Sequence, residues 1–201
     1  MISQLYSTAE NAPGSLAWSL EVKRLKAARR MGAAVGGIAI AAVFLIGFGE
    51  AFGLLISNTD SAAPAGVYRV VGSNVRRGDL VAACLPIAVA RQGLARGYLR
   101  TGGCPGGAEP VDKIIGALPG DLVDVEPGWV AVNGKRFAHS KTAVHDSAGR
   151  ALTHVVWGQH RVGPNGVWLF GFNDRRSWDS RYFGPVPIAN VHGELKPVVT
   201  W

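Results

Sequence analysis

Apolar residues fall into two kinds of pattern along this chain. A nearly unbroken apolar run extends over residues 31–57, whereas the residues after it form short apolar runs interrupted by glycine, proline and aspartate. The first pattern exceeds the roughly 20 residues that a helix needs to cross the hydrocarbon core of a membrane. Short runs rich in valine, isoleucine and aromatic residues favour β-strands. The pattern therefore predicts one membrane anchor followed by a domain of strands.

The expected strands are short and separated by turn residues. Asn133-Gly134, between two of them, is the strongest two-residue signal for a β-hairpin. Apolar and arginine residues interleave over residues 87–99, which predicts one short helix. Strands are expected over residues 67–71, 80–83, 113–117, 122–125, 129–132, 135–137 and 167–172. Together these elements predict an all-β domain of coiled, mostly antiparallel sheets, preceded by one N-terminal transmembrane helix.

The apolar run divides the chain into three parts. We expect residues 1–30 to form a cytoplasmic tail, residues 31–57 the transmembrane anchor and residues 58–201 one compact domain outside the membrane. A cleavable signal peptide is the alternative, but its apolar region of about 7–15 residues is shorter than this run. Glu50 is the only charged residue of the run and lies in its last third, where it can reach the interface or be protonated.

The distribution of charge orients the anchor. The chain has a net charge of +7 and 21 lysine and arginine residues, five of which lie between residues 23 and 30, just before the apolar run. For a protein of a bacterial inner membrane, the positive-inside rule then places the N-terminus in the cytoplasm and the domain in the periplasm. The remaining charges form no basic run longer than two residues, which disfavours a nucleic-acid partner and leaves a mild attraction to anionic lipid.

Cys84 and Cys104 are the only two cysteines of the chain. The inferred topology places both in an oxidising compartment, where disulfides persist, so we prefer a Cys84–Cys104 bridge. Two free buried thiols are the alternative. A metal site is less favoured, because there is no third thiol and the five histidines have no spacing typical of ligands. We therefore expect neither a metal nor a cofactor.

Three segments carry residues suited to nucleophilic catalysis. Residues 61–68 read Ser-Ala-Ala-Pro-Ala-Gly-Val-Tyr, residues 113–121 read Lys-Ile-Ile-Gly-Ala-Leu-Pro-Gly-Asp, and residues 177–187 read Ser-Trp-Asp-Ser-Arg-Tyr-Phe-Gly-Pro-Val-Pro. A serine hydroxyl needs a base to remove its proton, and a lysine serves only when its amine is neutral. Burial among apolar groups lowers the pKa of a lysine below its usual value of about 10.4. Asp112 is expected to face away from Lys113, because successive side chains of a strand point to opposite faces.

In this order, the three segments resemble the active-site boxes of the type I signal (leader) peptidases, which use a Ser-Lys dyad. The form Asp-Ser-x-x-Pro-x-Gly-x-Tyr at residues 60–68 and the Cys-Pro-Gly-Gly segment at residues 104–107 are similar to the TraF-type conjugal-transfer peptidases within that family. The resemblance covers roughly residues 50–201. Ala62 and Asp60 stand where the housekeeping enzymes carry Met and Gly, and residues 172–174 also depart from the housekeeping pattern, which favours the conjugal branch.

The resemblance implies roles for individual residues. Ser61 is the expected nucleophile and Lys113 its general base, and the backbone N–H of Ser61 and the hydroxyl of Thr59 are the expected oxyanion donors. Ser177 is expected to orient the lysine amine. Asp179 and Arg181 are expected to brace the site as an ion pair on one face of a strand.

The implied function is that of a membrane-anchored serine endopeptidase that cuts a precursor at the membrane. A conjugative prepilin is the expected substrate, and type IV secretion or mating-pair components are the expected protein partners. TraF-type enzymes are associated with cyclising the pilin, in which the substrate's own N-terminal amine takes the acyl group instead of water.

Two alternatives stay open. One is a housekeeping leader peptidase that releases secreted proteins from signal-peptide-bearing precursors. The other is a catalytically silent anchored scaffold in pilus assembly, although an inert relative is expected to have lost Ser61 or Lys113 and both are present. A Ser-His-Asp triad is disfavoured, because the chain has no Gly-x-Ser-x-Gly segment.

Overall fold

The structure is a computed structural model and describes residues 20, 23–38, 53–57, 62–72 and 74–201. The chain divides into two units, residues 1–51 and residues 52–201. In the first unit, residues 23–38 are helical. Among the described residues, no helix combines the length and the hydropathy needed to span a membrane. Residues 39–52 of the predicted anchor lie outside the described part of the chain.

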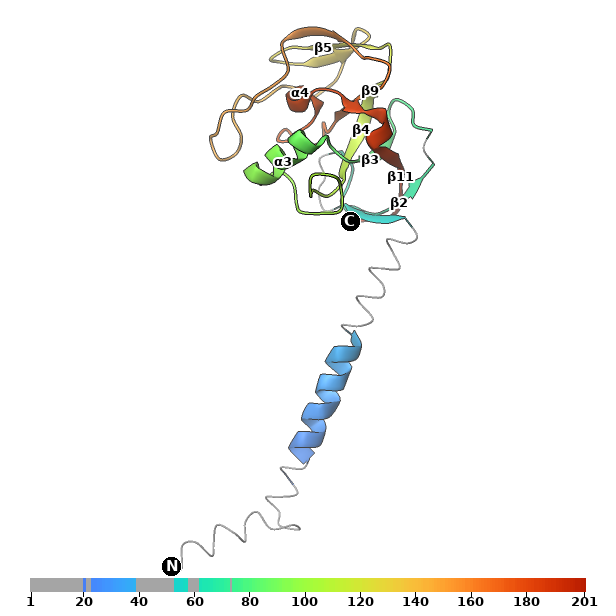
Figure 1. The fold of residues 1–201 in the computed structure, drawn as a ribbon, viewed down its shortest axis with the longest axis vertical. Coiled ribbons are helices and arrows are strands. Elements are labelled where there is room, and N and C mark those ends of the chain that lie inside the picture. Colours follow the sequence, from blue (N-terminus) through green and yellow to red (C-terminus); the bar gives the residue numbers. More distant parts are fainter. Residues whose placement is uncertain (1–19, 21–22, 39–52, 58–61, 73) are drawn as a thin grey trace, which may run out of the picture. The chain divides into compact units, whose positions relative to one another are not determined.

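The second unit is built from two antiparallel sheets (Figure 1). The larger has the strand order β1-β2-β11-β3-β4-β9-β10, and the smaller has the order β7-β6-β5-β8. The larger sheet contains β1 (Leu54–Ser57), β2 (Gly66–Val71), β3 (Leu80–Ala83), β4 (Val111–Ala117), β9 (Gly166–Phe170), β10 (Val186–Pro187) and β11 (Val191–Thr200). The smaller contains β5 (Leu122–Val125), β6 (Val130–Val132), β7 (Lys135–Arg136) and β8 (Gly158–Arg161). The predicted mainly β, antiparallel domain is confirmed.

In the described part of this unit, three short helices accompany the sheets: α3 (Ile87–Arg96), α4 (Ser180–Phe183) and the 3-10 helix η1 (Ile188–Asn190). The sequence predicts the first of these and neither of the others. Buried residues of α3, β3, β4 and β9 form one apolar cluster, against which Trp178 and Phe183 also pack. In Figure 1, α3 and α4 accordingly lie beside β4. A second apolar cluster joins β5 and β6 to Ala117 of β4 and to Trp168 and Phe170 of β9.

Strand β4 connects these two clusters through a β-bulge. Ile115 pairs with Leu169, and Ala117 pairs with Trp168, so that Gly116 is the extra residue. A Cβ atom on Gly116 would lie 2.1 Å from Cδ2 of Phe170, which only glycine avoids. Because the bulge changes which face each side chain points to, Ile115 joins the first cluster and Ala117 the second.

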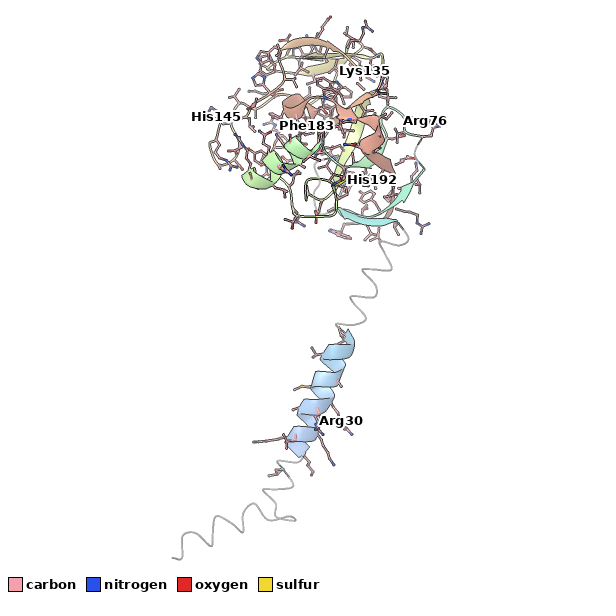
Figure 2. All side chains as sticks on the ribbon, viewed as in Figure 1. Arg30, Arg76, Lys135, His145, Phe183 and His192 are labelled. Carbon is pink, nitrogen blue, oxygen red and sulfur yellow. A yellow bond between two sulfur atoms is a disulfide. The ribbon has the colours of Figure 1, made fainter. Side chains whose placement is uncertain are left out.

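The hairpin between β6 and β7 forms where the sequence predicts it. Asn133 and Gly134 have φ angles of 49° and 80°, the two positive values that a type I′ turn requires. The turn leads Ala131 and Val132 back to pair with Arg136 and Lys135. Lys135, labelled in Figure 2, is exposed at this hairpin.

The last four residues of the predicted anchor form a strand instead. Leu54–Ser57 is β1 and pairs with β2, from Leu54 opposite Arg69 to Ser57 opposite Gly66. A short apolar run does not by itself distinguish helix from strand, and here β2 provides hydrogen-bond partners for its backbone. The anchor stays a prediction, and its C-terminal boundary moves from residue 57 to before Leu54.

Strand β11 is the longest strand among the described residues, and the sequence does not predict it. Gly193 and Pro197 interrupt its pattern, and both residue types normally weaken a strand. The strand accommodates them with two register shifts, one between Val191 and Gly193 and one between Pro197 and Val199. It thereby joins β2 to β3 in the middle of the larger sheet.

Candidate active site

Lys113 is a buried amine on an inner strand of the larger sheet. It lies on β4 opposite Val81 of β3, and only 7% of its surface is exposed. Asp112 pairs with Ala82 and is half-buried on the other face, as the alternation of the strand predicts. Burial lowers the pKa of Lys113 below its usual value, against the opposing charges of Asp179 and Asp112. The site thus favours the neutral amine that a general base requires.

Ser177 supplies a hydroxyl to this amine. The Lys113 Nζ atom donates a hydrogen bond to Ser177 Oγ at 3.2 Å, and Ser177 itself is buried. The backbone N–H of Ser177 donates to the carbonyl of Asp174 at 2.9 Å, which closes a tight turn before it. The structure therefore brings together two residues that lie 64 positions apart in the chain.

Asp179 and Arg181 form a fully buried, bidentate ion pair. Arg181 Nε donates to Asp179 Oδ1 at 2.8 Å and Arg181 Nη2 donates to Asp179 Oδ2 at 2.7 Å, while neither side chain is exposed to solvent. The sequence predicts the two residues on one face of a strand, and this local prediction is wrong. Asp179 is the N-cap of α4, where its carboxylate also accepts from the Arg181 backbone N–H, so a helical turn brings the two side chains together.

The same arginine connects the site to the long segment between β7 and β8. Arg181 Nη1 donates to the Lys141 carbonyl at 2.7 Å, and the Arg181 carbonyl accepts from the Val155 N–H at 3.0 Å. Arg181 Nη2 also donates to the Ser177 carbonyl at 3.1 Å. Because each of the three guanidinium nitrogens of Arg181 has an acceptor, the buried charge is stabilised and the backbone of Ser177 is fixed.

The Pro119-Gly120-Asp121 turn fixes the end of β4. The Asp121 carboxylate accepts from the Leu118 N–H at 2.7 Å and from Asn133 Nδ2 at 2.9 Å, and it also pairs with Arg77. Burial by itself raises the pKa of Asp121, but these donors outweigh it and hold that pKa below its usual value. The turn therefore stays closed through an ionised carboxylate.

The first box is described only from Ala62 onward, and Ser61 and Thr59 lie outside the described residues. Ala62 is buried, and Ala63 packs against the apolar cluster of Tyr68, Ala82 and Leu195. The Tyr68 hydroxyl donates to the Pro64 carbonyl at 2.6 Å. The segment that follows Ser61 is thus held by contacts to β2, β3 and β11.

The disulfide expected from the sequence is confirmed. Cys84 and Cys104 are bonded to each other, with their Cα atoms 5.5 Å apart, and link the end of β3 to the loop before β4. His192 Nε2 lies 3.2 Å from Cys84 Sγ; Figure 2 labels this histidine. These three side chains are the one group in the described chain with atoms close enough to hold a metal ion. Both sulfur atoms, however, are engaged in the disulfide.

The chain matches a known protein family over most of its length. The family model for signal peptidases of the S26 peptidase class matches residues 26–201. The chain belongs to the S26 signal peptidase family. Two relatives are similar over most of their length. One is the conjugal transfer protein TraF of Agrobacterium fabrum, 36% identical over 147 residues, which are 72% of this chain and 81% of the relative.

The other relative is the plasmid transfer protein TraF of Escherichia coli. It is 32% identical over 174 residues, which are 86% of this chain and 97% of the relative. Among solved structures, a signal peptidase I from Enterococcus faecalis matches with a TM-score of 0.36 and 23% identity. That match covers 61% of this chain and 97% of the solved chain.

Several residues around the site are not predicted by the S26 boxes. Gly171 donates its N–H to Asp179 Oδ2, and the Tyr182 hydroxyl accepts from the Ala143 N–H. Lys141 and Val155 contribute only backbone atoms, and so their side chains carry no signal in the sequence. Trp178 lies inside the third box, and its large aromatic side chain is the signal that the sequence offers for it.

Proposed function

We propose that this protein is a membrane-anchored serine endopeptidase of the TraF type that processes a precursor through an acyl-enzyme on Ser61. The observation that carries the proposal is the buried Lys113 amine, with its lowered pKa and its hydrogen bond to Ser177. A lysine in these surroundings has the properties of a general base rather than of a surface charge. The S26 family membership and the relatives named TraF support the same function.

In the proposed reaction, Ser61 Oγ attacks the carbonyl carbon of the scissile peptide while its proton moves to Lys113 Nζ. The tetrahedral oxyanion accepts hydrogen bonds from the Ser61 N–H and the Thr59 hydroxyl. Lys113 then returns the proton to the departing amine as the C–N bond breaks, which leaves an ester on Ser61. A second nucleophile attacks this ester, Lys113 accepts its proton, and Ser61 leaves with a proton restored.

We propose a conjugative prepilin as the substrate and its own N-terminal amine as the second nucleophile, which gives a cyclic product. The names of the TraF relatives support the conjugative setting. A tethered amine reaches effective concentrations of about 10⁵ M or more when it is well oriented, far above the concentration of water. The intact mass of the mature product separates the two outcomes. A cyclic product is one water lighter than the linear peptide, whereas a linear product with a free N-terminus contradicts cyclisation.

Substitution of the dyad tests the peptidase. Ser61→Ala and Lys113→Ala are each expected to abolish processing of the precursor by the full-length protein, while the matched control Lys135→Ala at the exposed hairpin keeps it. Wild-type activity is expected to rise with pH as Lys113 loses its proton. Processing by a folded Ser61→Ala variant, measured by immunoblot of the precursor, contradicts the proposal.

A further inference from the structure

The aromatic ring of Trp178 links the third box to α3, which carries none of the proposed catalytic residues. Trp178 stands between Ser177 and Asp179, and its side chain is half-buried. Its ring centroid lies 5.3 Å from that of Tyr98 and 5.1 Å from that of Phe183, the latter in an edge-to-face arrangement. Such pairs stabilise a defined ring orientation. Phe183, labelled in Figure 2, is the last residue of α4.

Gly93 brings α3 unusually close to this ring. A Cβ atom on Gly93 would lie 2.8 Å from Cζ3 of Trp178 and 2.6 Å from Cδ1 of Leu99. The missing side chain therefore makes room for both. The carbonyl of Gly93 also accepts from the N–H of Tyr98, which turns the chain back along the end of the helix.

Tyr98 is in turn fixed from outside the site. Its hydroxyl donates to Asp146 Oδ2 at 2.5 Å, and this bond holds the pKa of Asp146 below its usual range. Arg150 Nε also donates to Asp146 Oδ2, and Arg150 Nη2 donates to the carbonyl of Arg96. The end of α3 is therefore tied to the segment around residues 146–150, and the ring that contacts Trp178 is held at both of its ends.

Trp178 also packs against the apolar cluster to which the neighbours of Lys113 belong. This is the first apolar cluster, which contains Val111, Ile115 and Val81. Val111 and Ile115 lie two positions on either side of Lys113 on the same strand, and Val81 pairs with Lys113 directly. A gap at Trp178 would admit water to this cluster, and water stabilises a charged amine.

We propose that α3 positions the lysine base through Trp178, which holds the Ser177 hydroxyl against the Lys113 amine and keeps water from it. Trp178 and Gly93 are then positioning residues, whereas the catalytic groups are those of the boxes. This inference rests on the proposed role of Lys113, and its main test does not require peptidase activity.

The test measures the titration of Lys113 directly. The full-length protein in detergent is labelled with a trace of acetic anhydride between pH 6 and 11, and mass spectrometry quantifies acetylation at Lys113 and at exposed Lys135. The variants are Trp178→Ala, Trp178→Phe and Gly93→Ala. The matched controls are Trp129→Ala, a half-buried tryptophan just before β6, and Gly163→Ala, where a Cβ atom meets nothing within 4 Å.

Trp178→Ala and Gly93→Ala are expected to move the titration midpoint of Lys113 to higher pH, while Lys135 and both controls stay unchanged. Trp178→Phe keeps an aromatic ring and is expected to stay close to wild type. Processing at neutral pH should fall about tenfold or more in the first two variants and recover at high pH, because only the neutral amine is a base. A merely structural defect lowers activity equally at every pH.

An unchanged Lys113 midpoint in Gly93→Ala and Trp178→Ala overturns the inference. If Trp178→Ala does not fold, Gly93→Ala decides by the same criterion. If instead Ser61→Ala or Lys113→Ala still processes precursor, the proposed function fails. The titration result then still reports whether α3 controls the environment of the lysine.

Discussion

Burial of the Lys113 amine lowers the stability of the folded protein. The pKa of this buried group is lower in the folded chain than in the unfolded chain. Between the two values the unfolded chain binds more protons, so the stability rises with pH through this window. Below the folded value, the fold must hold a charged amine among apolar neighbours, and the cost is fully present.

Replacement of this amine by an apolar side chain of similar length should therefore stabilise the fold. We expect Lys113→Met to abolish processing and to raise the free energy of unfolding at neutral pH by about 1 kcal/mol. The rise in stability between neutral and alkaline pH should also disappear. Urea denaturation of the two proteins at both pH values checks this, and a clearly destabilised Lys113→Met protein contradicts it.

Substitution in the buried ion pair is expected to lower the stability of the fold. Asp179→Ala leaves the fully buried guanidinium of Arg181 without its carboxylate, and removal of one partner of such a pair typically costs about 3–5 kcal/mol. The exposed pair between Lys196 and Glu194 is the control, and Lys196→Ala should change stability by less than about 1 kcal/mol. Equal losses for both substitutions, measured by denaturant unfolding, argue against the bracing role of Asp179.

At the scale of elements, Asp121 couples the turn after β4 to two other segments. Its carboxylate contacts the Leu118 N–H within its own turn, the Asn133 side chain of the β6–β7 hairpin and the Arg77 side chain before β3. Three connections converge on one carboxylate. Changes at this position therefore affect the end of the strand that carries Lys113.

The pKa of Asp121 is held below its usual value in the folded protein. The stability that this carboxylate provides is therefore present at pH values above the usual pKa and is lost as the pH falls through the folded-state pKa. Asp121→Asn removes the charge and is expected to cost about 2 kcal/mol at pH 7 and less at pH 3, because the stability that depends on this charge decreases once the pH falls below the usual pKa. Thermal unfolding at the two pH values measures the difference. Asp124→Asn, a half-buried position on β5, is the control and should show no such loss.

At the scale of the whole molecule, the distribution of charge predicts where the β domain lies. The five cations between residues 23 and 30 are expected to keep the N-terminus in the cytoplasm. An alkaline phosphatase fused after Trp201 should therefore be active, because that enzyme needs the oxidising periplasm. An inactive phosphatase fusion together with a fluorescent cytoplasmic reporter at the same position contradicts the topology.

The sequence by itself determined the features that depend on neighbouring residues. The runs of β-branched residues predict β2, β3, β4, β5 and β9, and Asn133-Gly134 predicts the hairpin, because strand propensity and turn geometry are local properties. The two cysteines are the only pair in the chain, and the topology inferred from the charges places them in an oxidising compartment, which favours their bridge. The resemblance of the boxes to those of the signal peptidases points to Lys113 and Ser177, but it does not give the distance between them.

Only the tertiary structure decided the features that depend on distant partners. Leu54–Ser57 is a strand because β2 pairs with it, and β11 tolerates Gly193 and Pro197 because two bulges absorb them. Asp179 and Arg181 meet because Asp179 is the N-cap of α4, and the local sequence does not specify so short a helix. The contact between Gly93 and Trp178 joins residues 85 positions apart, and no local pattern encodes such a contact, because it arises only when the sheet and its helices pack.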